Sequence, residues 1–364
     1  MKNFLKKYIL LFLAIIAADI FVIIISTNKS GYELTMPGDI GDVNSIIQVE
    51  NGITLSGSFN TVSVYTYDHV TSLQAALLGF ENDTNNPTYD ISEPSVYYNL
   101  SHEEDIYSGK IQKEQSLETS LINAYKSAEL MGYDVHLDYE FKGFIIYLYF
   151  INQPVLRVGD LITSVDTVEG ETYGLDQYKE LYYRLYDLKS GDIVHFTRND
   201  SEMTYVLDED INGSSEENFE IKKNVFRFYF KYEINALNST PHFTIGQTNT
   251  LGPSGGFLQA LSTYCQLVGI DPTKGGKKIT GTGTIENNFL VGPIGGIKQK
   301  IVTAIRNDCD YFLCPAYHYK EALEAYNQTI GHEKMKLIEI PFAEGSGYYS
   351  SYLEALKILE ELAK

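Results

Sequence analysis

The sequence predicts a multi-domain α/β (α+β) protein held at a membrane by one N-terminal helix. Three observations lead to this prediction. The chain has 364 residues, of which 44% are hydrophobic and 21% are charged, a balance typical of folded chains with more than one domain. An apolar run lies close to the N-terminus. Beyond it, strand-like alternation and helix-like periodicity occupy separate stretches of the chain.

The N-terminal apolar run follows a short basic segment and is interrupted only by Asp19. Its length approaches the roughly 20 residues that a helix needs to cross a bilayer. A cleaved signal peptide is the alternative, because Ala17 and Ala18 offer small residues, but the apolar run continues beyond them. We therefore expect residues 1–27 to be a single-pass anchor in the cell membrane. Basic residues before it and an acidic remainder after it predict a cytoplasmic N-terminus and an extracytoplasmic body.

The formal net charge of −20 argues against nucleic acid as a partner, because phosphate binding needs a basic surface. The three cysteines are Cys265, Cys309 and Cys314. Cys265 falls on an apolar helical face, where a buried role is expected, and a pairing of Cys309 with Cys314 stays open. No Cys/His cluster has the spacing of metal ligands, so we expect no metal and no cofactor.

Residues 28–125 are expected to form an N-terminal extracytoplasmic region. Alternating patterns predict strands at residues 45–49 and 57–65, and residues 81–87 read as a loop. Helical periodicity follows at residues 117–131, with Gly132 placed to end the helix.

Residues 126–209 have a pattern of their own. An apolar strand at residues 144–151 precedes the segment V-G-D-L-I-T-S-V-D, which ends at Asp166; a helix near residues 175–188 and a second Gly-Asp turn at Gly191 follow. This order resembles a PDZ domain of the kind attached to proteases. The usual ligand-binding loop is reduced to Lys142-Gly143-Phe144, and the usual short helix to residues 152–154. Peptide binding and a purely structural role therefore both stay open.

Residues 212–218 read as a linker, and the C-terminal domain is expected at residues 219–364, with a first strand at 225–234. Its first motif is G-P-S-G-G, centred on Ser254 and followed by an apolar helical face that ends at Gly269. A serine nucleophile needs a tight exposed turn close to free backbone N–H groups. Ser254 at a helix N-terminus meets that need, since the dipole there favours developing negative charge.

Two further motifs follow Ser254 in order: T-G-T-I, which begins at Thr282, and P-I-G-G-I-K-Q-K, which ends at Lys300. Together the three segments resemble the proteolytic domain of Lon proteases. The resemblance implies that Ser254 is the nucleophile and Lys300 the general base, that Thr282 supports one of them, and that Lys298 is a surface lysine. Two positions depart from the family pattern: Gly255 stands where alanine is usual, and Thr284 stands where an acid is usual.

A lysine base must be neutral, so its pKa has to fall about 3 units from its usual 10.4, and burial among apolar residues can supply such a shift. No ATP-binding G-x-x-x-x-G-K-[ST] motif occurs. The sequence therefore predicts an ATP-independent, membrane-anchored serine endopeptidase that cleaves exported peptides or surface proteins. The resemblance also implies a homo-oligomer.

Three alternatives remain. G-P-S-G-G also fits the nucleophile turn of α/β-hydrolases, with His318 or His332 as base. A chymotrypsin-like site is the second alternative, although Pro253 replaces the usual aspartate before the serine. The third is a catalytically silent, membrane-anchored PDZ scaffold.

Overall fold

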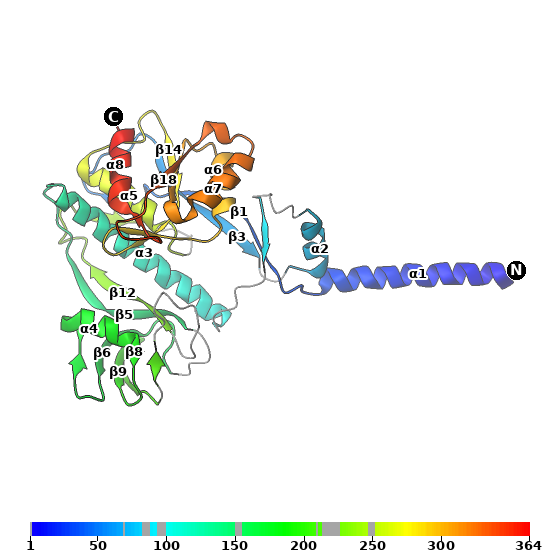
Figure 1. The fold of residues 1–364 in the computed structure, drawn as a ribbon, viewed down its shortest axis with the longest axis horizontal. Coiled ribbons are helices and arrows are strands. Elements are labelled where there is room, and N and C mark those ends of the chain that lie inside the picture. Colours follow the sequence, from blue (N-terminus) through cyan, green and yellow to red (C-terminus); the bar gives the residue numbers. More distant parts are fainter. Residues whose placement is uncertain are drawn as a thin grey trace.

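The computed structural model describes residues 2–67, 70–81, 88–92, 100–149, 155–208, 210–212, 226–246 and 252–364. Helix α1 (Lys2–Thr27) projects from the body of the molecule (Figure 1). Within it, residues Lys7–Thr27 are long and apolar enough to cross a membrane. The short helix α2 (Ser72–Glu81) lies against α1. This agrees with the expected anchor, whose orientation stays a prediction.

The larger unit is built on one mixed sheet. Its strand order is β18 (Lys336–Ile340), β17 (Tyr311–Pro315), β14 (Lys278–Gly281), β3 (Ser58–Tyr67), β1 (Glu33–Asp42) and β4 (Asp90–Ser92). Strands β3, β14, β17 and β18 run parallel, and β1 and β4 are antiparallel additions. The strands that precede residue 70 therefore share a sheet with strands that follow residue 277. The expected boundary between residues 28–125 and 219–364 does not coincide with the limits of this sheet.

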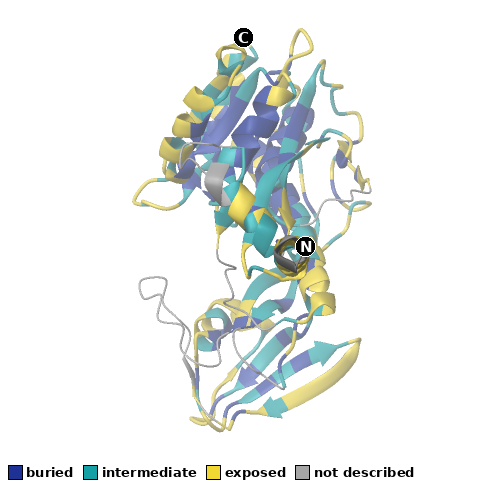
Figure 2. Ribbon diagram, turned by 90° about the vertical axis from the view of Figure 1, so that its right-hand side faces the viewer, coloured by how far each residue is buried: buried dark blue, intermediate teal, exposed yellow. Residues whose placement is uncertain are grey.

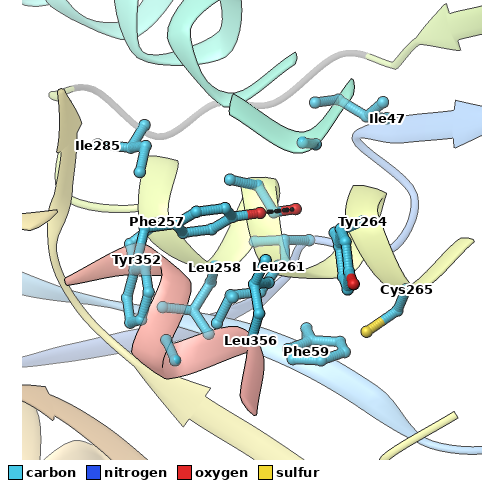
Figure 3. Close-up of a cluster of buried hydrophobic side chains, with 14 of the residues drawn as sticks. Ile47, Phe59, Phe257, Leu258, Leu261, Tyr264, Cys265, Ile285, Tyr352 and Leu356 are labelled. Atoms are coloured by element: carbon cyan, nitrogen blue, oxygen red, sulfur yellow. Dashed lines mark hydrogen bonds between the residues drawn. The ribbon is translucent and has the colours of Figure 1, made fainter. Parts of the chain in front are cut away.

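Helices cover both faces of the mixed sheet. Helices α3 (His102–Leu130), α5 (Gly256–Val268) and α8 (Tyr352–Leu362) pack on one face, and α6 (Ile297–Arg306) and α7 (Ala316–Gln328) on the other. Successive strand residues point to opposite faces, so Phe312 joins the α6–α7 core and Leu313 the α3–α5–α8 core. Figure 3 shows the second core, in which Phe257 and Leu261 of α5 meet Tyr352 of α8. Because helices cover both faces of the mixed sheet, much of the sheet is deeply buried (Figure 2).

The smaller unit is a separate sheet. Its order is β10 (Ser201–Val206), β9 (Ile193–Arg198), β6 (Leu161–Asp166), β5 (Tyr139–Tyr149) and β12 (Phe226–Ile234), with β7 (Thr172–Tyr173) beside β6. A 3₁₀ turn (Leu175–Gln177) leads into α4 (Tyr178–Leu185), which packs on this sheet, and β8 (Asp187–Leu188) pairs with β11 (Ile211–Asn212). The chain leaves the larger unit after α3 and re-enters it after β12. We call this inserted part the β unit.

The remaining elements complete the larger unit. Strand β2 (Ile47–Val49) pairs with β13 (Phe243–Ile245), and β15 (Thr284–Glu286), β16 (Leu290–Gly292) and β19 (Ser350–Ser351) form a small sheet, with a 3₁₀ turn at His332–Lys334. The pairing of β2 with β13 joins the segment before α3 to the segment after β12.

Two Gly-Asp turns organise the β unit in the same way. Gly159 and Gly191 adopt φ values of 94° and 92°, which favour glycine. Each following aspartate is fully buried and accepts bonds from backbone N–H groups and from an arginine, Arg198 for Asp160 and Arg184 for Asp192. A buried carboxylate is stable when paired and hydrogen-bonded in this manner.

Several expectations for local structure are confirmed with altered limits. The strands expected at 45–49 and 57–65 correspond to β2 and β3, and the helix expected at 117–131 is the last part of α3. The strand expected at 225–234 is confirmed as β12, which pairs with β5 along its whole length in the sheet of the β unit and does not join the mixed sheet. The linker expected at 212–218 and the loop at 81–87 fall almost wholly outside the described residues.

Candidate functional site

Ser254 lies in a tight turn directly before helix α5. Gly252 adopts φ 88°, a conformation that favours glycine, and α5 begins at Gly256 and ends with Gly269 at φ 76°. Gly255 faces β3: a Cβ there would lie 3.1 Å from the Thr61 hydroxyl oxygen. The departure from alanine at position 255 thus matches a close approach between this turn and β3.

Helix α3 holds the Ser254 turn from the side. Ser116 Oγ donates to the Pro253 carbonyl at 3.0 Å. Ser120 Oγ lies 2.6 Å from the Ser116 carbonyl of its own helix and 2.8 Å from the Gly256 carbonyl, and the two carbonyls share its one proton. A Cβ on Gly256 would meet Ser116 Oγ at 2.2 Å, so glycine is required for this contact. These two serines were missed by the sequence reasoning, because their pattern is that of ordinary polar positions on a helix more than 130 residues upstream.

Lys300 lies on α6, which packs on the face of the mixed sheet opposite to α3. The residue is 3% exposed, and burial lowers the pKa of its ammonium to about 7. Ile297 and Ile301 are buried beside it, as the apolar neighbourhood in the sequence predicted. Among the described residues no carboxylate forms an ion pair with Lys300. By contrast, Lys298 is a surface residue whose Nζ lies 3.7 Å from Glu321.

Thr282 connects Lys300 to the Ser254 turn. Lys300 Nζ donates to Thr282 Oγ1 at 3.0 Å, and Thr282 Oγ1 lies 3.4 Å from the Ser254 carbonyl, to which it donates. The neighbouring Gly283 N–H donates to the same carbonyl at 3.0 Å. The structure therefore brings together all three residues singled out in the sequence. Within the described part of the chain, no hydrogen bond joins the Ser254 hydroxyl directly to Lys300.

His318 is a second titratable group close to Lys300. Its Nε2 accepts the Ile294 backbone N–H at 2.9 Å, which places the ring proton on Nδ1. Burial, and then the charge of Lys300, lower the pKa of His318. His332 is engaged with the Thr329 carbonyl. Neither histidine forms a hydrogen bond with Ser254 among the described residues, so nothing there supplies the serine–histidine pair of the two alternative hydrolase sites.

The cysteines are all buried and free, and Cys309 and Cys314 form no disulfide with each other. Burial raises the pKa of Cys309 to about 11 and that of Cys265 well above its usual value. Buried thiols with raised pKa values are poor nucleophiles. Over the described ranges, no group of three His, Cys, Asp or Glu side chains is arranged to hold a metal ion.

The chain matches no protein-family model, and no curated protein matches it significantly.

Proposed function

We propose that the chain is a serine endopeptidase in which Ser254 is the nucleophile and Lys300 the general base. One observation carries the proposal: Lys300 is buried with no carboxylate partner among the described residues, its pKa is lowered to about 7, and Thr282 links it to the turn that holds Ser254. A lysine with such a pKa is largely neutral at mildly alkaline pH and able to accept a proton.

In the acylation step, Ser254 Oγ attacks the carbonyl carbon of the peptide bond while its proton passes to the neutral Lys300 amine. The Thr282 hydroxyl, which contacts Lys300 Nζ and the Ser254 carbonyl, keeps the amine beside the turn. Hydrogen bonds between a base and its nucleophile commonly tighten only when substrate is bound. Collapse of the tetrahedral intermediate transfers the proton from Lys300 to the leaving amine and produces an ester on Ser254.

In the second step, Lys300 takes a proton from water while the water oxygen attacks the ester carbonyl. Collapse of the second tetrahedral intermediate breaks the bond to Ser254 Oγ, which takes the proton back from Lys300, so that the free hydroxyl and the neutral amine are restored. Negative charge develops on the former carbonyl oxygen in both steps. The backbone N–H groups of Ser254 and Gly255 precede the first turn of α5, where free N–H groups and the helix dipole stabilise an anion. Neither N–H has a partner among the described residues.

The motifs around these residues resemble those of Lon proteases, and the V-G-D-L-I-T-S-V-D segment of β6 resembles a PDZ domain. We extend the proposal accordingly to an ATP-independent enzyme, anchored by α1 with its body outside the cell, that cleaves exported peptides or surface proteins. The acidic charge of −20 and the apolar helix agree with that placement.

The test is covalent labelling of the full-length chain in detergent micelles with a peptidyl phosphonate, with the adduct mapped by mass spectrometry. We expect labelling at Ser254, at a rate that rises with pH through about 7 and is lost in Lys300→Ala. Lys298→Ala is the matched control and should label at the normal rate. Labelling that persists in Lys300→Ala would contradict the assignment of the base, and an unlabelled, folded chain would contradict the assignment of the nucleophile.

A further inference from the structure

A cavity of about 350 Å³ lies where the β unit meets α3 and the turn between β15 and β16. Its walls come from α3, β5, the start of α4, β12 and that turn. None of Ser254, Thr282 and Lys300 lines it. It is therefore distinct from the candidate catalytic site, although it borders the same helix, α3.

We call it the joint cavity, because it lies between the β unit and the larger unit. Aromatic rings dominate its walls; they belong to Tyr139, Phe141, Tyr178, Phe230, Tyr232 and Phe289. Phe141 and Tyr178 are tilted at a centroid distance of 5.7 Å, Tyr139 and Tyr232 meet edge-on at 5.6 Å, and Phe230 and Tyr232 are stacked at 6.3 Å. Such walls favour a further planar ring, which gains stacking and edge-to-face contacts beyond its buried area. The volume is at the lower end of ligand pockets and suits one large side chain with its flanking backbone.

Two polar residues of the wall differ in whether their side chains already have hydrogen-bond or ion-pair partners. Asn123 is engaged: its Nδ2 donates to the Thr119 and Glu286 carbonyls, and its Oδ1 accepts the Phe289 N–H. Lys126 lies over the Tyr139 ring at 5.4 Å and has no carboxylate partner in the described part of the chain. An exposed ammonium beside an aromatic cavity favours a ligand with a carboxylate next to its ring.

One way in which a protein can hold an extended peptide is closed at β5, the central strand beside this cavity. A peptide adds to a sheet through an unpaired strand edge. Strand β5 is paired with β12 from Tyr149 to Tyr139 and with β6 on its other side. Among the described strands β5 therefore has no free edge at its centre, so a peptide in the cavity contacts β5 through side chains; the sheet ends at β12 and β10.

Helix α3 sets the separation between this cavity and the candidate catalytic site. Ser116 contacts the Pro253 carbonyl, and Asn123 lines the cavity seven positions later (123 − 116 = 7). At about 1.5 Å per residue the two points are about 10 Å apart along the helix axis. An extended peptide covers that distance in about three residues, at about 3.3 Å each.

We propose that the joint cavity is a substrate subsite that takes an aromatic side chain about three residues from the cleaved bond, with an adjacent acidic residue bound by Lys126. The proposed subsite defines the class of peptide that the endopeptidase cleaves, and the inference rests on the proposed function. Specificity then comes from the joint between the two units.

Binding is tested without turnover in full-length Ser254→Ala in detergent micelles. The chain contains no tryptophan, so a peptide with a single Trp-Glu step reports its own binding by fluorescence. We expect a saturable blue shift, weakened at least tenfold by Tyr178→Ala and about fivefold by Lys126→Met. Tyr178 is 42% exposed, so its loss should leave the melting temperature unchanged. Lys110→Met, an exposed lysine on the same helix, is the control and should bind normally.

A Trp-Gln peptide separates the two contributions, because Lys126→Met should not weaken its binding. Equal affinity in Tyr178→Ala and the parent chain would overturn the subsite, as would equal affinity for Trp-Glu and Ala-Glu peptides.

Cleavage by the active chain gives the second readout. Peptides in which one Trp is moved stepwise away from the cleaved bond should show at least a tenfold rise in kcat/KM at one position, lost in Tyr178→Ala. Uniform cleavage of the series overturns the inference while the endopeptidase stands. Normal Trp-Glu binding by a chain that neither cleaves nor reacts with the phosphonate contradicts the proposed function and leaves the cavity as a binding site only.

Discussion

Two lysines in this molecule lie in partly or fully buried surroundings and differ in whether an acid accompanies them. Lys231, on β12, has its side chain 28% exposed and lies 2.5 Å from Glu118 of α3. Burial lowers its pKa, but the charge and hydrogen bond of Glu118 outweigh burial and raise it. Lys300, on α6, is buried and has no such partner in the ranges that the structure describes, and its pKa falls to about 7. Lys231 links the β unit to α3 of the larger unit, and Lys300 is able to accept a proton.

The comparison shows that burial alone does not make a base. A buried amine becomes neutral near physiological pH only when no acidic side chain lies close enough to stabilise its charged form. The hydroxyl of Thr282 satisfies one N–H of Lys300 without adding negative charge. The predictions below remove the Lys300 amine, give Lys300 an acidic partner, or remove an acidic partner of Lys231. The last prediction removes the α3 hydroxyls beside the Ser254 turn.

The largest effect is expected on stability, when Lys300 is replaced by Met. Below pH 7 the folded state bears the full cost of a buried ammonium. Between about 7 and the ordinary value of 10.5 only the unfolded state keeps the proton, so this cost falls as pH rises. Lys300→Met should therefore stabilise the chain by about 5 kcal/mol at pH 6 but only by about 2 kcal/mol at pH 9.

Urea unfolding at the two pH values measures this difference. Lys298→Met, on the exposed side of α6, is the control and should change little at either pH. A stabilisation by Lys300→Met that does not depend on pH would show that Lys300 titrates normally in the folded state.

Thr282→Asp would place a carboxylate where Lys300 now contacts a hydroxyl, and so copy the environment of Lys231. The pKa of Lys300 should return to its ordinary range, which leaves about 10³-fold less neutral amine at pH 7. The rate of phosphonate labelling at pH 7 should fall by that factor and recover toward high pH. Thr282→Ser retains the hydroxyl and should stay within about threefold of the parent rate. The acid limb is the fall of the labelling rate toward low pH. If this fall still occurred near pH 7 in Thr282→Asp, the comparison would be refuted.

Glu118→Gln removes the closer and less exposed partner of Lys231 and leaves its partly buried ammonium with only the exposed Glu114, at 3.5 Å. We expect a loss of about 1–3 kcal/mol in unfolding free energy, because both side chains are only partly removed from water. Calorimetry of the full-length chain measures it, with Glu114→Gln, on the more exposed neighbour, as control. Unchanged stability would mean that this pair contributes nothing to the joint.

The smallest effects are expected for the α3 hydroxyls that hold the Ser254 turn. Ser116→Ala and Ser120→Ala each remove one hydrogen bond to a backbone carbonyl, worth about 1 kcal/mol, and should lower kcat about fivefold with little change in KM. The acid limb of the pH profile should remain near 7, since neither serine contacts Lys300. A shift of that limb would mean that α3 acts on the base instead of on the nucleophile turn.

The sequence predicted the local parts of this molecule better than their assembly. The helix after Ser254, the buried setting of Lys300 and the contact made by Thr282 follow from short motifs whose chemistry is local. The insertion of the β unit does not, because β12 alternates like any strand and nothing in its pattern states that it pairs with β5. The roles of Ser116 and Ser120 depend on packing between distant segments, so no spacing in the sequence marks them.

The central claim is that Lys300 is a neutral amine near physiological pH, and its titration tests that claim most directly. Lysines labelled with ¹³C at Cε, in full-length chain in detergent micelles, report their protonation by NMR, and the resonance missing from Lys300→Met identifies Lys300. We predict an inflection at about pH 7 for this signal while Lys231 stays charged beyond pH 10. A Lys300 signal that titrates near 10.4, the ordinary value for lysine, would contradict the account.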